Sequence, residues 1–311
     1  MPNFKENIPL DKFSSYRIGG PSRYFVEAKN ERAVAQSVRE AKSEDLRYFV
    51  LGGGTNLLID DDGFDGLVLK PNINFIRQKG DTLHVGAGVL VSDLLNFTIE
   101  KGLSGLEWAG GLPGTIGGAV RGNAGAFGGE TKDHIGTVQS IDADTLEHRD
   151  RNNPQCAFGY RSSYFKEAGR DEIVLDATFH LKKGNPDKIR TAVEEKISYR
   201  KERHPMEYPN IGSIFKNVPA ERVPRAHRAR VKDVIKTDPF PVVPTAYLIS
   251  EAGLKGVSSG GAMISPKHPN FIANVLHARA ADVRALIALI KSEVKKKFGI
   301  ELEEEVVYVS S

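Results

Sequence analysis

Two glycine-rich stretches point to chemistry more directly than any other part of this sequence. Residues 52–56 read Gly-Gly-Gly-Thr-Asn and follow an apolar run, and a second cluster extends over residues 109–128. Glycine lets the backbone approach a ligand closely, and successive amide N–H groups can then cradle a diphosphate. Thr55, Asn56 and Thr115 would add side-chain hydrogen bonds. A dinucleotide lying across both loops is one interpretation, and tight turns in an irregular sheet domain are the other.

Neither glycine cluster is a common nucleotide-binding fingerprint. The G-x-G-x-x-G spacing of a Rossmann domain is missing, and no Gly-Lys-Ser/Thr follows as it does in a P-loop. Because two clusters so rich in glycine occur close together, we favour the dinucleotide over the turns.

The elements that must position these loops alternate between helix and strand. Residues 30–42 predict a helix capped by Asn30, with Val34, Val38 and Ala41 on one face. A buried strand over 48–51 should lead directly into the first glycine cluster. Further strands are expected at 67–69 and 82–85, and a helix capped by Ser92 should run to Lys101 and end at Gly102.

The second half of the chain continues this alternation. Apolar residues alternate over 173–181, which predicts a half-buried strand. Asn185 and Pro186 favour the start of a helix that must end near Arg203, before His204-Pro205. The last clear helix is expected over 280–298 and a final strand over 305–309.

Composition and charge are those of an ordinary soluble globular protein. The chain has 311 residues, of which 40% are hydrophobic and 27% charged, with a formal net charge of +3. That charge is too small to indicate nucleic-acid binding. The single cysteine excludes an intramolecular disulfide, and no residue spacing suggests a metal site. Neither a signal peptide nor a membrane-spanning run is visible, so we expect a cytoplasmic protein without membrane or nucleic-acid partners.

The order of several motifs resembles the UDP-N-acetylenolpyruvoylglucosamine reductase family, also called UDP-N-acetylmuramate dehydrogenases. Both glycine loops look like the family's flavin-diphosphate loops. Residues 159–163 (Gly-Tyr-Arg-Ser-Ser) look like its tyrosine–arginine motif, and 212–217 (Gly-Ser-Ile-Phe-Lys-Asn) like its catalytic serine motif. Residues 14–20, 246–256 and Glu305-Val306 complete the series. The chain resembles the shorter subgroup of this family.

The resemblance implies an α+β fold and a division into three parts. Residues 1–184 would form an FAD-binding domain similar to that of vanillyl-alcohol oxidase, with subdomains of about 1–70 and 71–184. Residues 200–300 would form a smaller α/β substrate-binding domain, and 301–311 a strand carrying Glu305 back to the active site. The residues expected to contact FAD are Gly52, Gly53, Gly54, Thr55, Asn56, Leu57, Gly114, Thr115, Gly117, Gly118, Asn123 and Gly125.

The implied activity is that of a flavoprotein oxidoreductase of peptidoglycan biosynthesis. It would reduce UDP-N-acetylglucosamine enolpyruvate to UDP-N-acetylmuramate, with FAD as cofactor and NADPH as co-substrate. Arg161 would bind the substrate carboxylate, a protonated Glu305 would stabilise the enolate, and Ser213 would protonate the α-carbon. Among the neighbouring acidic residues, the resemblance favours the glutamate directly before valine, and strand alternation would place Glu303 with Glu305 on one face.

We expect a monomer or a weak oligomer. The resemblance also implies substrate contacts for a further group of residues. A basic segment, residues 222–236, departs from the family pattern; it is either a solvated insertion or a partner for a substrate or NADPH diphosphate. His268 is either a substrate contact or structural. The residues implied in substrate binding are Tyr160, Lys216, Asn217, Lys255 and His268.

Two other functions stay open at this point. A flavin oxidase of the same superfamily would lack the serine motif at 212–217. A non-catalytic flavin- or nucleotide-binding module would not have its flavin bleached by NADPH.

Overall fold

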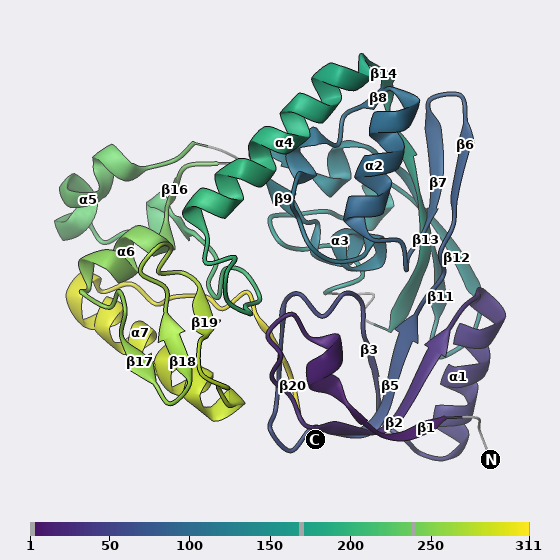
Figure 1. Ribbon diagram of the computed structural model, residues 1–311, viewed down its shortest axis with the longest axis horizontal. Helices are drawn as coiled ribbons and strands as arrows, with labels where there is room; N and C mark the ends of the chain where they lie inside the picture. The colour runs from purple at the N-terminus through teal and green to yellow at the C-terminus, as the bar shows by residue number, and fades with distance from the viewer. Residues whose placement is uncertain (1–3, 168–170, 238–239, 311) are drawn as a thin grey trace. The chain divides into compact units, whose positions relative to one another are not determined.

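A computed structural model, drawn in Figure 1, describes residues 4–167, 171–237 and 240–310. The chain divides into two compact units, each assembled from separate segments. The first contains the chain up to Ile8, Ser22–Gly53 and Asp65–Arg200; the second contains Pro9–Pro21, Gly54–Phe64 and the chain from Lys201. The sequence-based domain limits are continuous, whereas here two short segments from the expected FAD-binding domain group with the C-terminal residues.

The first unit contains a four-stranded sheet next to helix α1. Asn30 accepts a 2.9 Å hydrogen bond from the Ala33 N–H and begins α1 (Glu31–Ser43), as predicted. The predicted apolar face of this helix is buried. In sheet order, the strands are β1 (Lys5–Pro9), β2 (Pro21–Ala28), β5 (Phe64–Pro71) and β3 (Tyr48–Val50).

A five-stranded sheet forms the centre of the same unit. Its middle strand, β13 (Glu172–His180), was expected to be half-buried, but both of its faces are covered. Val174, Ala177 and Phe179 pack with the α2 and α3 side, while Ile173 and Leu175 pack with α1 (Figure 1). The remaining strands, in sheet order around β13, are β12 (His148–Asn152), β11 (Ile135–Asp142), β7 (Thr82–Gly86) and β6 (Ile76–Lys79).

Three helices cover one side of the five-stranded sheet: α2 (Val91–Lys101), α3 (Ile116–Gly122) and α4 (Pro186–Arg203). The expected Ser92 cap is wrong, because α2 begins at Val91 and Leu90 occupies the cap position without a side-chain bond. Gly102 ends α2 at φ +61°, a left-handed conformation that suits glycine. Short strands complete the unit: β8 (Leu103–Ser104), β9 (Gly125–Ala126), β10 (Gly129–Glu130) and β14 (Lys182–Lys183).

The second unit is organised around helix α7 (Ala280–Phe298), whose predicted apolar face is buried. This helix packs on a small sheet and on α6 (Thr245–Glu251). The other elements of the unit are β15 (Val218–Pro219), α5 (Arg225–Val231), β16 (Val242–Val243), β17 (Ser258–Ser259), β18 (Ala262–Ile264) and β19 (Ile272–Asn274).

Hydrogen bonds explain why the two short N-terminal segments join the second unit. Strand β4 (Leu57–Ile59) pairs in parallel with β20 (Val307–Val309), and the Tyr16 hydroxyl donates to the Ile272 carbonyl at 2.8 Å. The final strand was predicted over 305–309, but in the structure it covers only Val307–Val309. The expected α+β fold class is confirmed. Within the described ranges, no helix is long and apolar enough to cross a membrane.

Candidate functional site

The two glycine clusters touch each other within the first unit. A Cβ atom at Gly53 would lie 2.6 Å from the Cα of Gly114, and one at Gly52 would lie 3.1 Å from the Thr115 Oγ1. Contacts this short would force the backbone to move, so glycine at position 53 lets the two loops meet. The loops thereby form one continuous backbone surface in this unit.

Part of the second cluster is open rather than packed. A Cβ at Gly118 would have only the Thr115 Oγ1 nearby, at 3.7 Å, and one at Gly122 would have no neighbour within 4 Å. Protein packing therefore does not require glycine at Gly118, whereas the close approach of a ligand would. Contact of a cofactor with Gly118 stays a prediction.

Other glycines in the second cluster serve helix α4. A Cβ at Gly110 would lie 2.5 Å from the Val193 carbonyl oxygen, and one at Gly111 would lie 3.0 Å from the Cδ of Arg200. Gly111 also has φ +71°. Helix packing thus accounts for the first glycines of this cluster, although the sequence suggested ligand contact for the cluster as a whole.

Two asparagines expected to contact FAD use their side chains within the protein. The Asn56 amide donates to the Glu305 carbonyl at 2.9 Å. The Asn123 amide donates to the Gly159 carbonyl at 2.9 Å and accepts from the Lys132 N–H at 3.1 Å. These hydrogen bonds fix the loops, and contact of Asn56 and Asn123 with FAD stays a prediction.

Arg161 lies beside the second glycine cluster, in the same unit. Its Nη2 donates to the Gly125 carbonyl at 2.8 Å, and its guanidinium lies 5.2 Å from the centre of the Tyr160 ring. Its backbone has φ +54°, a left-handed conformation that costs a non-glycine residue about 1–3 kcal/mol. Strain of this kind is typical of sites where side-chain placement matters more than stability.

Ser213 lies in a tightly held loop of the second unit. Gly212 has φ +80°, and the two residues after Ser213, Ile214 and Phe215, are hydrogen-bonded to Asn270. The Ile214 N–H donates to the Asn270 carbonyl at 2.8 Å, and the Asn270 side chain bonds both the N–H and the carbonyl of Phe215. No described residue hydrogen-bonds the half-buried Ser213 hydroxyl, which is therefore available to a ligand.

Glu305 is brought to the same loop. Its N–H donates to the Ile214 carbonyl at 2.8 Å, immediately after Ser213. The structure thus places two of the three expected catalytic residues together in one unit, whereas Arg161 belongs to the other unit. The regular strand starts at Val307, and Glu304 forms an isolated antiparallel bridge with Phe215, so the expected alternation over 303–305 stays a prediction.

The other glutamates near Glu305 are engaged by lysines. Glu301 pairs with Lys295 at 2.6 Å, Glu304 pairs with Lys291 at 2.6 Å, and Glu303 pairs with Lys216. The ion pair with Lys295 lowers the pKa of the Glu301 carboxyl. The choice of Glu305 within the acidic run stays a prediction.

The expected substrate residues of the second unit differ in their surroundings. The Asn217 side chain accepts from the Thr245 N–H at 3.2 Å. Lys255 is exposed and forms no ion pair with any described residue. Burial lowers the pKa of His268 to about 4, so it is neutral, and its Nδ1 is buried without a hydrogen-bond partner among the described residues. It packs edge-on against His204 and Phe271.

The basic segment 222–236 folds onto the core of the second unit. Val223 and Val231 are buried, so the segment is a packed insertion rather than a loose loop. The guanidinium of Arg228 donates to the Val223 and Glu221 carbonyls, and Arg230 pairs with Glu251 at 2.7 Å. Arg222 also pairs with Glu303 at 3.6 Å, so three of its arginines are engaged by the fold. A role for the segment with a diphosphate stays a prediction.

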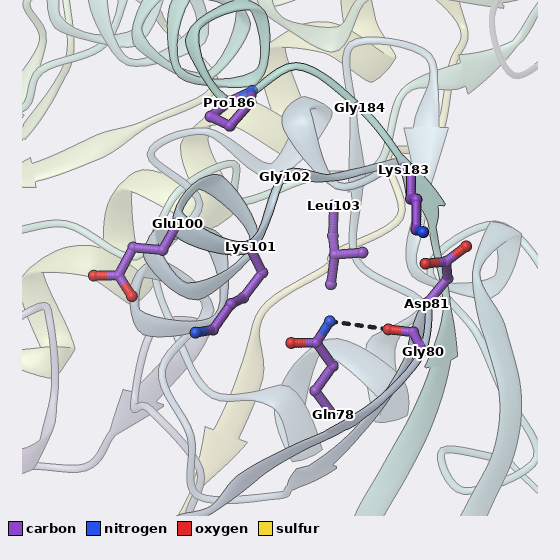
Figure 2. Close-up of a pocket in the computed structure, with 10 residues that line it drawn as sticks. All are labelled: Gln78, Gly80, Asp81, Glu100, Lys101, Gly102, Leu103, Lys183, Gly184 and Pro186. Atoms are coloured by element: carbon purple, nitrogen blue, oxygen red, sulfur yellow. Dashed lines mark hydrogen bonds between the residues drawn. The ribbon is translucent and has the colours of Figure 1, made fainter.

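A surface cleft of the first unit is lined by other residues. Figure 2 shows this surface cleft of about 580 Å³, with Lys101 and Glu100 on one side and Lys183 and Asp81 on the other. Its charges are balanced, and none of the expected site residues lines it. Size alone therefore does not locate the site.

Metal and thiol chemistry have no visible support in the described parts of the chain. No group of three or more His, Cys, Asp or Glu side chains there could hold a metal ion. Burial raises the pKa of the Cys156 thiol to about 11, so this residue is not a ready nucleophile.

Sequence reasoning missed two residues that matter in this geometry: Asn270, which holds the Ser213 loop, and Arg200, which reaches Gly110. Arg200 stands in the charged run Tyr199-Arg200-Lys201-Glu202-Arg203, which is typical of a solvated helix face. Asn270 follows a His-Pro pair and resembles an ordinary turn residue. Neither carries a spacing signal.

Comparison with known proteins agrees with this geometry. Residues 22–149 match a model described as an FAD binding domain, and residues 204–309 match the C-terminal domain of UDP-N-acetylenolpyruvoylglucosamine reductase. Proteins with this name from Solibacter usitatus and Lachnoclostridium phytofermentans are 34% and 38% identical to the chain. They align over 99% and 96% of this chain and over 98% and 91% of their own lengths.

A solved structure shows the same likeness over the whole chain. The crystal structure of UDP-N-acetylenolpyruvylglucosamine reductase from Thermus caldophilus aligns with a TM-score of 0.77 and 28% identity, covering 99% of this chain and 100% of its own. FAD is therefore the cofactor of this chain. The chain belongs to the UDP-N-acetylenolpyruvoylglucosamine reductase family of flavin-dependent oxidoreductases.

Proposed function

We propose that this chain uses NADPH to reduce UDP-N-acetylglucosamine enolpyruvate to UDP-N-acetylmuramate, a cytoplasmic step of peptidoglycan synthesis. Membership of the reductase family supports the substrate. The observation that carries the proposal is the 2.8 Å bond from the Glu305 N–H to the Ile214 carbonyl, because it joins a serine and a carboxyl group in one loop system.

Arg161 is proposed to bind the carboxylate of the enolpyruvyl group. Bound FAD would supply hydride transfer to the β-carbon of that group. Negative charge then develops towards the carboxylate, where a guanidinium can bind two oxygens at once. The bond from Nη2 to Gly125 and the stacking on Tyr160 orient this guanidinium in advance.

Ser213 and Glu305 are proposed to complete the reaction in the second unit. A protonated Glu305 would donate a hydrogen bond to the developing enolate. The Ser213 hydroxyl would then deliver its proton to the α-carbon, and Asn270 would keep the serine loop rigid while it does so.

Five further side chains are proposed as substrate contacts. Lys255 is an exposed cation without an ion-pair partner among the described residues, which suits a phosphate oxygen. Tyr160 would shape the pocket on the first unit. Lys216, Asn217 and His268 are proposed contacts of the second unit.

An anaerobic two-step reaction tests this function. The purified yellow protein should bleach when NADPH is added, and UDP-N-acetylglucosamine enolpyruvate should restore the flavin absorbance at 450 nm or thereabouts. Mass spectrometry should then show a product heavier than the substrate by two hydrogens. Bleaching without recovery would reject the substrate, and a flavin that NADPH cannot bleach would reject the reductase function altogether.

A further inference from the structure

Arg200, in the last turn of α4, is held tightly against the second glycine cluster. Its Nε donates to the Gly110 carbonyl at 2.9 Å, and its Cδ would lie 3.0 Å from a Cβ at Gly111. Its guanidinium lies 5.2 Å from the centre of the Phe127 ring. These contacts are unusual for a residue in a charged helical run, because they fix the guanidinium instead of leaving it in solvent.

One nitrogen of this guanidinium, Nη2, has no hydrogen-bond partner among the described residues. Nη2 is buried and forms no hydrogen bond with any described residue, and Arg200 forms no ion pair within the described ranges. A buried donor to which no bond is made costs about 1–3 kcal/mol, and more when the group is charged. A fixed guanidinium with a buried, unbonded N–H group therefore indicates a missing acceptor.

The charges nearby indicate that this acceptor is an anion. Burial lowers the pKa of Arg200, and the positive charge of Arg161 lowers it further. Arg161 contacts Gly125 of the same glycine cluster, so two guanidinium groups act on one another in the first unit. A positive charge beside a second one favours an anion over a neutral acceptor, and phosphate oxygens suit the fork that a guanidinium presents.

We propose that Arg200 is a diphosphate-binding residue of the first unit, with Nη2 donating to a phosphate oxygen of a ligand other than FAD. The identity of this ligand rests on the proposed function, which supplies two candidates, the UDP-sugar and NADPH. Arg200 thereby acts beside Arg161 but on a different anionic group.

The probe is inorganic pyrophosphate added to the FAD-loaded protein. Trp108 is the only tryptophan and lies two residues before Gly110, so its fluorescence, together with the flavin difference spectrum, reports on this site. We expect Arg200→Met to weaken pyrophosphate binding by about 10- to 100-fold, as the loss of a charge-assisted hydrogen bond does. Arg190→Met is the matched control, because Arg190 is an exposed arginine of the same helix, and it should bind as the wild type does.

A second variant guards against a folding defect. Arg200→Lys keeps the charge and the aliphatic stem but loses the fork, so it should retain the flavin and still bind pyrophosphate several-fold more weakly than the wild type. Wild-type affinity in both Arg200 variants would overturn the proposal. So would a wild-type holoenzyme that does not bind pyrophosphate at all, because FAD would then already occupy Arg200.

UDP and NADP⁺ titrations identify the source of the diphosphate. Weaker binding of UDP alone in Arg200→Met assigns the UDP-sugar, weaker binding of NADP⁺ alone assigns the nicotinamide nucleotide, and weaker binding of both assigns a shared position. Failure of the proposed function would be seen separately, as wild-type flavin that the enolpyruvyl substrate cannot reoxidise while pyrophosphate binding still depends on Arg200.

Discussion

The N–H of Glu305 donates a 2.8 Å hydrogen bond to the carbonyl of Ile214, the residue that follows Ser213. A second bond in the same register joins the Lys216 N–H to the Glu303 carbonyl at 2.9 Å. The C-terminal segment is thus paired with the serine loop before it enters β20. The residues that carry the Glu305 carboxyl and the Ser213 hydroxyl are far apart in the sequence, but their backbone segments are thereby hydrogen-bonded to each other.

Replacing Ser213 should separate the two half-reactions. Ser213→Ala removes the proposed proton donor, so reoxidation of the flavin by the enolpyruvyl substrate should slow by about 100- to 10,000-fold. Reduction by NADPH should remain within about twofold of the wild-type rate, because that step needs no proton from Ser213. Stopped-flow absorbance of the flavin measures both steps.

The control for this prediction is Ser292→Ala, which removes an exposed hydroxyl on α7 and should leave both steps unchanged. Normal reoxidation in Ser213→Ala would exclude Ser213 as the proton donor. Slowing of both steps to the same extent would indicate a disturbed fold instead.

Asn270 should stabilise the protein through the serine loop. Its buried side chain bonds both polar backbone groups of Phe215, at 3.1 and 2.8 Å. Asn270→Ala leaves a buried N–H and a buried carbonyl without partners, so the free energy of unfolding should fall by about 2–4 kcal/mol. Urea denaturation measures this, with the exposed Asn96→Ala on α2 as the control. A change no larger than that of the control would mean that the loop is held by other contacts.

Local signals in the sequence predicted the elements that depend on neighbouring residues. Asn30 begins α1 and Gly102 ends α2 because caps act within one helical turn. The apolar face of α7 followed from its 3.6-residue period. The glycine loops were visible from their residues, whereas the serine motif was found through the resemblance, since a Gly-Ser pair alone is compatible with an ordinary turn.

Features that depend on distant partners could not be predicted in this way. Alternation in β13 indicated one buried face, but α1 covers its other face, and the period of a strand does not reveal what lies beyond it. The parallel pairing of β4 with β20 joins residues 57–59 to residues 307–309, which are far apart in the sequence. Gly110 and Gly111 are explained only by α4, which begins some 75 residues later in the sequence.

Substitutions at two glycines should distinguish loop packing from ligand approach. Gly53→Ala places a Cβ 2.6 Å from the Cα of Gly114, so it should lower the free energy of unfolding of the FAD-free protein by about 1–3 kcal/mol. Gly118→Ala meets only the Thr115 Oγ1 at 3.7 Å, so it should leave that stability nearly unchanged and weaken FAD binding by about tenfold or more. Flavin fluorescence titration and thermal unfolding measure the two quantities.

Gly122→Ala is the control for both variants, because a Cβ at that position would meet no atom within 4 Å. It should keep both the stability and the FAD affinity of the wild type. Unchanged FAD affinity in Gly118→Ala would show that the cofactor does not approach this part of the loop.

His268 should make the stability of the protein depend on pH between about 4 and 6.5. Burial lowers its pKa from 6.5 to about 4, so between these values the unfolded chain binds a proton that the folded chain does not. The unfolded state then gains stability as the pH falls, and the free energy of unfolding should decrease by up to about 3 kcal/mol from pH 6.5 to pH 4. Urea denaturation at several pH values should show a smaller decrease in His268→Gln, while the exposed His277→Asn should keep the full one. An equal slope in wild type and His268→Gln would mean that His268 is already protonated when folded.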